Sequence, residues 1–206
     1  MRIACPAFLF RLYELVIPMT TYSPTVNMNP RGEGRSMSIA FSVSRCSPIE
    51  LLSRFPGYAM PPVNVLEIAR GSGVEVYATE FSEADGEDVS GSIEIEDGNP
   101  VIYVNQEHSE TRQRFTIAHE LGHWFCGHLT GEDGKIIDNA KRKRSAKWDV
   151  NEREANQFAA ELLMPSRLLK LAIESGIKRH NDLAVLFHVS QEAMSYRLQN
   201  VRGVLF

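Results

Sequence analysis

The sequence predicts an α+β fold, in which a small antiparallel sheet is followed by a helical half. Residues 89–105, VSGSIEIEDGNPVIYVN, contain two strand-like runs on either side of Asp97, Gly98 and Asn99, and this arrangement is typical of a hairpin. Beyond Ser109 the chain is expected to form helices to its end. With 206 residues, of which 43% are hydrophobic and 23% charged, the chain is long enough for one domain with its own core.

The first 36 residues are expected to lie outside the folded domain. Residues 20–36, TTYSPTVNMNPRGEGRS, are polar and rich in Pro, Gly, Ser and Asn, a composition typical of disorder. The opening apolar run is interrupted by Arg11 and Glu14, so it is too short for a signal peptide. We therefore expect residues 1–36 to be either disordered or an extension upstream of the true start.

Composition also limits the location and the partners of the protein. The net charge of −4 argues against a surface that binds nucleic acid throughout. No stretch approaches the roughly 20 apolar residues that span a bilayer, so no membrane association is expected. The three cysteines, Cys5, Cys46 and Cys126, are widely spaced and form neither a disulfide framework nor a zinc knuckle. These features favour a cytoplasmic protein.

Residues 61–81 are expected to form a helix, a turn and a strand in front of the hairpin. Val65, Ile68 and Ala69 have helical spacing, two glycines end the helix, and VEVYATEF then alternates. In the hairpin, Pro100 opens the second strand, where a missing N–H is tolerated best.

Helices are expected in the second half of the chain, separated by a charged loop that includes AKRKRSAK. Ser109 provides an N-cap for the first helix and Glu110 an acid in its first turn. Pro165 ends the second helix. The expected helices are residues 109–127, residues 151–163, the segment PSRLLKLAIES, and two short helices in the tail.

The segment FTIAHELGHWFCGH, residues 115–128, has the spacing of a metal site. His119 and His123 lie about 40° apart on one helix face, one turn from each other, and two imidazoles so placed can bind one zinc ion. Glu120 lies beside them and can act as a general base on a water molecule. Gly122 costs about 1 kcal/mol of helix stability relative to Ala, which a small residue between two ligands would explain. The alternative is a buried helix whose histidines form hydrogen bonds in the core.

A catalytic zinc needs a third protein ligand, and the segment NEREANQFAAELLMP, residues 151–165, offers two acids. Glu152 and Asn156 are spaced i and i+4 on a helix, so Asn156 can form a hydrogen bond with a ligand from the same face. We therefore favour Glu152, although spacing alone leaves Glu154 open.

Two residues near the end of the first long helix are weaker candidates. His128 lies about 140° around the helix from His123, so we expect a helix-terminal residue or a partner of a ligand rather than a ligand. Cys126 lies about two turns from His119 and is expected to be a small buried thiol.

The segments RQRFTIAHELGHWFCGH and EREANQFAAELLMP together resemble the ImmA/IrrE family of zinc metallopeptidases, and GSIEIEDGNPVIYVN is similar to the hairpin of that family. The resemblance covers about residues 60–200. It implies a minimal zincin-like metallopeptidase domain, which we place at residues 37–178. It also implies Zn²⁺ bound by His119, His123 and Glu152, with Glu120 as the base.

The resemblance further implies a partner, because members of the family typically cleave or otherwise inactivate a helix-turn-helix repressor. Such repressors control a prophage, another mobile element or a stress regulon. The competing hypothesis is a non-catalytic, metal-bearing regulatory protein that binds a repressor or DNA. An open fourth metal position and Glu120 favour the endopeptidase.

The tail, residues 179–206, resembles a helix-turn-helix motif in DLAVLFHVSQEAMSYRL. His188 stands where a turn glycine is usual, and Glu192 would repel phosphate at the start of the second helix. We therefore expect these helices to pack on the peptidase domain and direct DNA binding to be disfavoured. The run KRKR, residues 141–144, is expected to be a solvated loop, with a role near substrate or DNA as the alternative.

Two further expectations concern the substrate. The strand that ends in VIYVN could be a sheet edge with which an extended peptide pairs. Tyr103 and Tyr196 could donate to an oxyanion, although aromatic residues more often serve in a core.

Overall fold

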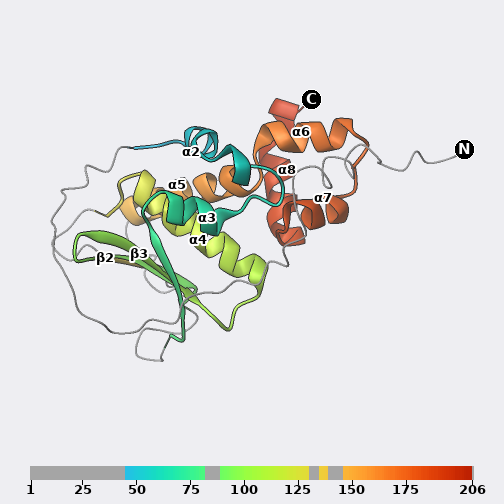
Figure 1. The fold of residues 1–206 in the computed structure, drawn as a ribbon. Coiled ribbons are helices and arrows are strands. Elements are labelled where there is room, and N and C mark those ends of the chain that lie inside the picture. Colours follow the sequence, from blue (N-terminus) through green and yellow to red (C-terminus); the bar gives the residue numbers. More distant parts are fainter. Residues whose placement is uncertain (1–44, 82–88, 130–134, 139–145, 206) are drawn as a thin grey trace, which may run out of the picture.

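A computed structural model describes residues 45–81, 89–129, 135–138 and 146–205 (Figure 1). The proposed extension, residues 1–36, and the KRKR run, residues 141–144, lie outside this part of the chain. The strands form one four-stranded sheet of order β1-β3-β2-β4. They are β1 (Glu75–Thr79), β2 (Gly91–Glu96), β3 (Asn99–Asn105) and β4 (Lys135–Asp138).

Helices precede β1, separate β3 from β4 and follow β4, and most of them come after the hairpin, so the predicted α+β class is confirmed. They are α2 (Pro48–Arg54), the 3-10 turn η1 (Pro56–Tyr58), α3 (Val65–Gly71), α4 (Glu110–Phe125), α5 (Ala146–Leu163), α6 (Ser166–Glu174), α7 (His180–Phe187) and α8 (Gln191–Leu205). In the described ranges, every helix is too short or too polar to cross a membrane.

The predicted hairpin is present, and its turn has the expected geometry. Strands β2 and β3 pair antiparallel, and the turn residues Asp97 and Gly98 have positive φ angles of 49° and 82°. Glycine adopts such angles without strain and Asp tolerates them, which is why this pair favours a two-residue turn.

The expectation of a purely antiparallel sheet is wrong for one pair of strands. Strand β1 runs parallel to β3, with Val76 opposite Ile102. Strand β2 pairs with the other side of β3, so β3 is an inner strand and its backbone groups already bond to two neighbours. The expectation that β3 offers an edge to a peptide is therefore wrong as well.

Helix α4 lies between the sheet and helix α5 (Figure 1). Its buried residues Ala118 and Leu121 join Ile93 and Ile102 of the sheet in one hydrophobic core. Gly91 of β2 allows a close approach, because a Cβ there would lie 2.4 Å from the Thr116 Cγ2 atom on α4. The sheet and α5 therefore hold α4 from two sides, which gives its side chains a fixed frame.

Helices α6, α7 and α8 gather at the end of the molecule away from β2 and β3 (Figure 1). Two buried arginines form hydrogen bonds that attach α7 to α4 and α8 to the end of α5. Arg114 of α4 donates to the carbonyl oxygen of His188 at 3.2 Å, and Arg197 of α8 donates to the carbonyl oxygen of Met164 at 3.0 Å. His188 ends α7 in the left-handed region, with φ 51° and ψ 56°, so it takes the backbone conformation for which glycine is usual.

Candidate metal centre

Helix α4 presents His119 and His123 from adjacent turns of one face. Both side chains are buried, and their Nε2 atoms lie 3.0 Å apart. Two imidazole nitrogens in contact need a proton or a cation between them, because both lone pairs would otherwise face each other without compensation. The arrangement therefore differs from that of two core histidines that each bond to a separate partner.

Helix α5 brings the carboxylate of Glu152 to this pair. Its Oε2 atom lies 3.3 Å from Nε2 of His119, and its Oε1 atom lies 3.2 Å from Nε2 of His123. One ligand atom from each residue lies within 4.8 Å of the others. Of the two acids that spacing left open, Glu152 is the one that meets both imidazoles.

The tautomer of His119 is set by Asn156. The Oδ1 atom of Asn156 lies 3.1 Å from Nδ1 of His119, and an amide oxygen only accepts hydrogen bonds. Nδ1 of His119 therefore carries the proton, which leaves the Nε2 lone pair directed at the other imidazole and the carboxylate. The sequence predicted this contact from the i and i+4 spacing of Glu152 and Asn156.

The electrostatics of the site favour a bound cation. Burial alone would raise the pKa of Glu152. In the absence of a metal ion, protons on the Nε2 atoms of His119 and His123 outweigh burial through hydrogen bonds and positive charge and hold the pKa at about 2, and a bound cation would take the place of these protons. Burial lowers the pKa of His123, against the opposing effect of Glu152. An ionised carboxylate beside an imidazole that resists protonation is a donor set suited to a divalent metal ion. Two imidazoles and one carboxylate are a common ligand set of catalytic zinc, so the residues present fit such an ion.

The contact between α4 and α5 depends on Gly122. A Cβ atom at this position would lie 2.9 Å from the Ala155 Cα atom and 3.0 Å from the Ala155 carbonyl oxygen. The missing side chain therefore lets the α5 backbone approach α4 between the two histidines. This closeness is what brings Glu152, three residues before Ala155, within reach of both rings.

Glu120 follows His119 directly in the helix, and its side chain is fully buried. Tyr103 lies elsewhere, because its hydroxyl donates to Oε1 of Glu96 at 2.7 Å and its strand position pairs with Ser92. Gly91 faces α4, so the next residue, Ser92, and its partner Tyr103 face away from α4. Tyr103 is therefore wrong as an oxyanion donor.

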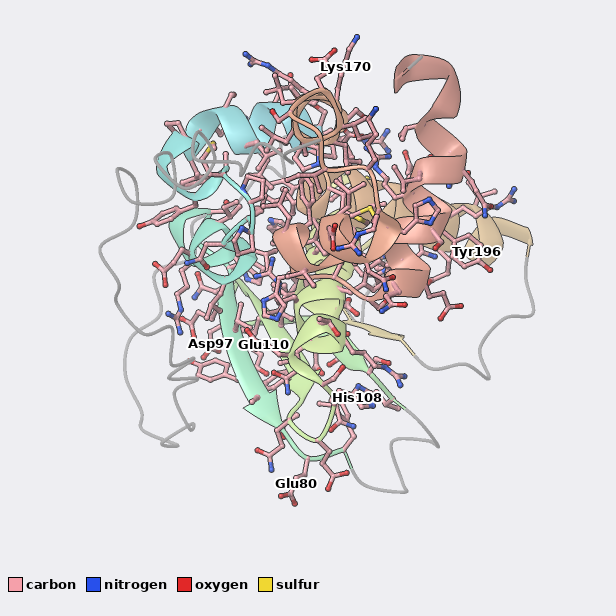
Figure 2. The ribbon with its side chains drawn as sticks, turned by 90° about the vertical axis from the view of Figure 1, so that its right-hand side faces the viewer. Glu80, Asp97, His108, Glu110, Lys170 and Tyr196 are labelled. Carbon is pink, nitrogen blue, oxygen red and sulfur yellow. The ribbon has the colours of Figure 1, made fainter. Side chains whose placement is uncertain are left out.

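A cavity of about 1590 Å³ lies beside the metal centre, and His119, His123, Glu152 and Glu120 themselves are not among its lining residues. Its lining includes Asn156, which bonds to His119, and Phe115, whose ring stacks on His119 with centroids 6.1 Å apart. Tyr196 of α8 also lines the cavity, and its side chain is exposed at the border of the molecule in Figure 2. The cavity thus extends from two neighbours of His119, Asn156 and Phe115, to α8.

Glu154 and His128 form a hydrogen bond with each other, which residue spacing in the sequence could not predict. Oε2 of Glu154 lies 3.0 Å from Nε2 of His128, and Nδ1 of His128 lies 3.0 Å from Nδ1 of His123. Cys126 is partly buried nearby, and burial raises the pKa of its thiol to about 11. The only sequence signal was the position of His128 just beyond the helix end.

Comparison with known proteins places the site in a family context. A family model described as the IrrE N-terminal-like domain, Peptidase M78, matches residues 69–199. These residues include both histidines, Glu120 and Glu152.

Individual relatives match over part of their length. The chain is 29% identical over 103 residues to "Metallopeptidase ImmA" of Bacillus subtilis (strain 168), a match that covers 49% of this chain and 56% of the relative. A solved structure described as a Mycobacterium tuberculosis transcriptional regulator has a TM-score of 0.52 and 18% identity, and the match covers 74% of this chain and 46% of that one. The chain thus spans about half the length of each, and the solved structure supports the fold alone.

Proposed function

The chain belongs to the ImmA/IrrE family, and from this premise we propose that it is a zinc-dependent endopeptidase that cleaves, and so inactivates, a helix-turn-helix transcriptional repressor. The observation that carries the proposal is the position of the Glu152 carboxylate, 3.3 Å and 3.2 Å from the two imidazole nitrogens.

His119, His123 and Glu152 would hold the ion. Three protein ligands leave one position of a tetrahedral set for water or substrate, whereas a structural zinc site is closed by four protein ligands. The zinc ion would polarise the scissile carbonyl and make a water molecule more acidic. Asn156 would keep His119 in the tautomer that presents Nε2.

Glu120 would move the proton. As a carboxylate next to a ligand, it would accept a proton from the attacking water molecule and pass it to the leaving amine. Because Glu120 is not a ligand in this assignment, its replacement separates metal binding from catalysis.

The cavity supports a macromolecular substrate. Its volume of about 1590 Å³ exceeds the roughly 300–1,000 Å³ that is typical of small-molecule sites. Phe115 and Tyr196 in its lining provide apolar area for peptide side chains. The identity of the substrate as a repressor is supported by the family resemblance.

The test compares wild type with Glu120→Gln, using purified small helix-turn-helix repressors as candidate substrates, first among them any that a neighbouring reading frame proves to encode. We expect wild type to cleave one of these repressors, a chelator to stop cleavage, and Glu120→Gln to keep its zinc but lose cleavage. If Glu120→Gln inactivates the repressor as well as wild type does, the protein acts without hydrolysis, and the competing hypothesis of a metal-bearing regulatory protein is supported.

A further inference from the structure

We propose that Glu154 and His128 position His123 for metal binding, through a chain of two hydrogen bonds that ends at the side of the His123 ring away from the ion. This inference rests on the proposed function, because it requires His123 to be a metal ligand.

The two hydrogen bonds join an exposed side chain of α5, Glu154, through His128 to a buried side chain of α4, His123. Oε2 of Glu154 lies 3.0 Å from Nε2 of His128, and Nδ1 of His128 lies 3.0 Å from Nδ1 of His123. The side chains of His128 and His123 are 5% and 0% exposed, whereas that of Glu154 is 53% exposed. The rings of His128 and His123 meet edge to face at 71°. Such contacts leave the buried His123 ring little freedom to rotate.

The direction of the hydrogen bonds follows from the chemistry of the three groups. A carboxylate only accepts, so Nε2 of His128 donates to Glu154. A neutral imidazole carries one N–H, so Nδ1 of His128 accepts from Nδ1 of His123. His123 therefore keeps its proton on Nδ1, and its Nε2 lone pair faces His119 and Glu152.

Both ligand imidazoles thus donate a hydrogen bond from Nδ1, the ring nitrogen opposite the proposed ion, and each has a different acceptor. Asn156 accepts from Nδ1 of His119, and His128 accepts from Nδ1 of His123. A partner of this kind fixes the ring and raises the basicity of the ligand nitrogen. Asn156 comes from the same face of α5 as Glu152, but His128 comes from the chain that follows α4.

The backbone after α4 explains why His128 can reach His123. Gly127 has a φ of 72°, a left-handed conformation that reverses the chain at the helix end. The N–H of His128 then donates to the carbonyl oxygen of His123 at 2.9 Å. This turn returns the His128 ring to His123, although helical spacing would place the two residues far apart around the axis.

A competing assignment uses the same residues as a second metal site. Cys126, His128 and Glu154 also offer ligand atoms within 4.8 Å of one another. A metal ion on Nε2 of His128 would move the remaining proton to Nδ1, which would donate to Nδ1 of His123; a neutral His123 would then carry its own proton on Nε2 and could not bind the first ion through that atom. The positioning role leaves the proton of His123 on Nδ1, as the first site requires. The test below distinguishes this role from a second ion.

The experiment measures Zn²⁺ affinity by competition with a chromophoric chelator, together with the zinc content per chain. Removing such a partner typically weakens metal binding about 10–100-fold. We expect this loss for His128→Leu, a smaller loss for Glu154→Ala, and no change for Glu174→Ala, which removes an exposed acid on α6. His128→Asn should restore much of the affinity, because its amide oxygen can accept from His123. The unfolding midpoint of each metal-free variant monitors folding.

The double variant His128→Leu with Glu154→Ala should lose no more affinity than His128→Leu alone, because the two residues act in series. Equal zinc affinity in wild type and His128→Leu would overturn the positioning role while leaving the endopeptidase intact. Two ions per chain, one of them lost in Cys126→Ser, would overturn it in favour of the second site. A wild type that binds no zinc would instead overturn the proposed function itself.

Discussion

Oε1 of Glu152 lies 3.2 Å from Nε2 of His123, although the two residues belong to different helices. This contact exists because α5 crosses α4 at Gly122 with its backbone nearly touching. The position of one carboxylate thus depends on the packing of two helices.

The first prediction concerns pH, in the presence of a chelator. Glu152 has a folded pKa of about 2 against an ordinary value of 4.5, so its contribution to stability is present above pH 4.5 and is lost as the pH falls towards 2. Burial lowers the pKa of His123 below 6.5, so stability also falls as the pH drops below 6.5. We expect urea denaturation to show a continuous loss of unfolding free energy from pH 7 downward.

Glu152→Gln is the control for this pH dependence. It should remove the part of the loss between pH 4.5 and 2, on the order of 3 kcal/mol, and keep or enlarge the part that belongs to His123, because Glu152 no longer opposes the effect of burial on that imidazole. A stability that stays flat between pH 7 and 4 would argue against the described electrostatics.

The second prediction is that Gly122→Ala destabilises the protein, although alanine has a higher helix propensity than glycine. Ala gains about 1 kcal/mol over Gly within a helix. Its Cβ atom, however, would lie 2.9 Å from the Ala155 Cα atom, and overpacking costs about 1–3 kcal/mol. We expect a lower thermal midpoint and weaker zinc binding, because the shift of α5 moves Glu152.

Gly57→Ala is the matched control, since a Cβ there meets nothing within 4 Å. An unchanged zinc affinity in Gly122→Ala would show that close helix contact is not what places Glu152.

The third prediction concerns Arg197, which holds α8 against the junction of α5 and α6. Arg197 is buried, and its guanidinium also bonds to Glu161 and, at 2.8 Å, to Oγ of Ser166. Breaking a fully buried ion pair by removing one partner costs about 3–5 kcal/mol, and because the Glu161 side chain is 22% exposed we expect the lower end of this range. We expect Arg197→Ala to lower the free energy of unfolding by about that amount in urea denaturation, whereas Arg167→Ala, at an exposed position, should change it by less than about 0.5 kcal/mol.

The fourth prediction is that Cys126 is unreactive. Burial, with a smaller contribution from Glu154, raises the pKa of its thiol to about 11, so at pH 8 almost none of it is thiolate. We expect iodoacetamide to modify Cys126 on the order of 100-fold more slowly at pH 8 than a free cysteine with a pKa of about 8.5, as followed by peptide mass spectrometry. Rapid modification in the native state would contradict the described environment.

The features that the sequence predicted correctly are those that depend on local spacing. The hairpin follows from the Asp97–Gly98 turn, and the shared helix face of His119 and His123 follows from an i and i+4 separation. The choice of Glu152 over Glu154 as a ligand stays a prediction, but the expected proximity of Glu152 to both imidazoles and of Asn156 to His119 is present. Helical geometry fixes such relationships before any tertiary contact forms.

The features that the sequence missed depend on distant contacts or on short elements. The parallel pairing of β1 with β3 depends on which strand occupies the other side of β3. Strand β4 has only four residues, and we expected a charged loop there. Helix α2 was missed although Ser47 and Glu50 form a capping box with Pro48 in the first turn, a local signal that was available. A role for His128 as the partner of a ligand was one of two expectations, but its contact with His123 in particular could not be predicted, because it depends on the left-handed Gly127.

The most direct measurement is zinc X-ray absorption on the purified wild-type protein, combined with metal analysis. One zinc ion per chain is predicted, with a shell of nitrogen and oxygen ligands at about 2.0–2.2 Å that includes two imidazoles. The same spectrum from Glu152→Ala should lose an oxygen ligand or show no bound ion. A sulfur ligand at about 2.3 Å, or a wild type without metal, would contradict the assignment of His119, His123 and Glu152.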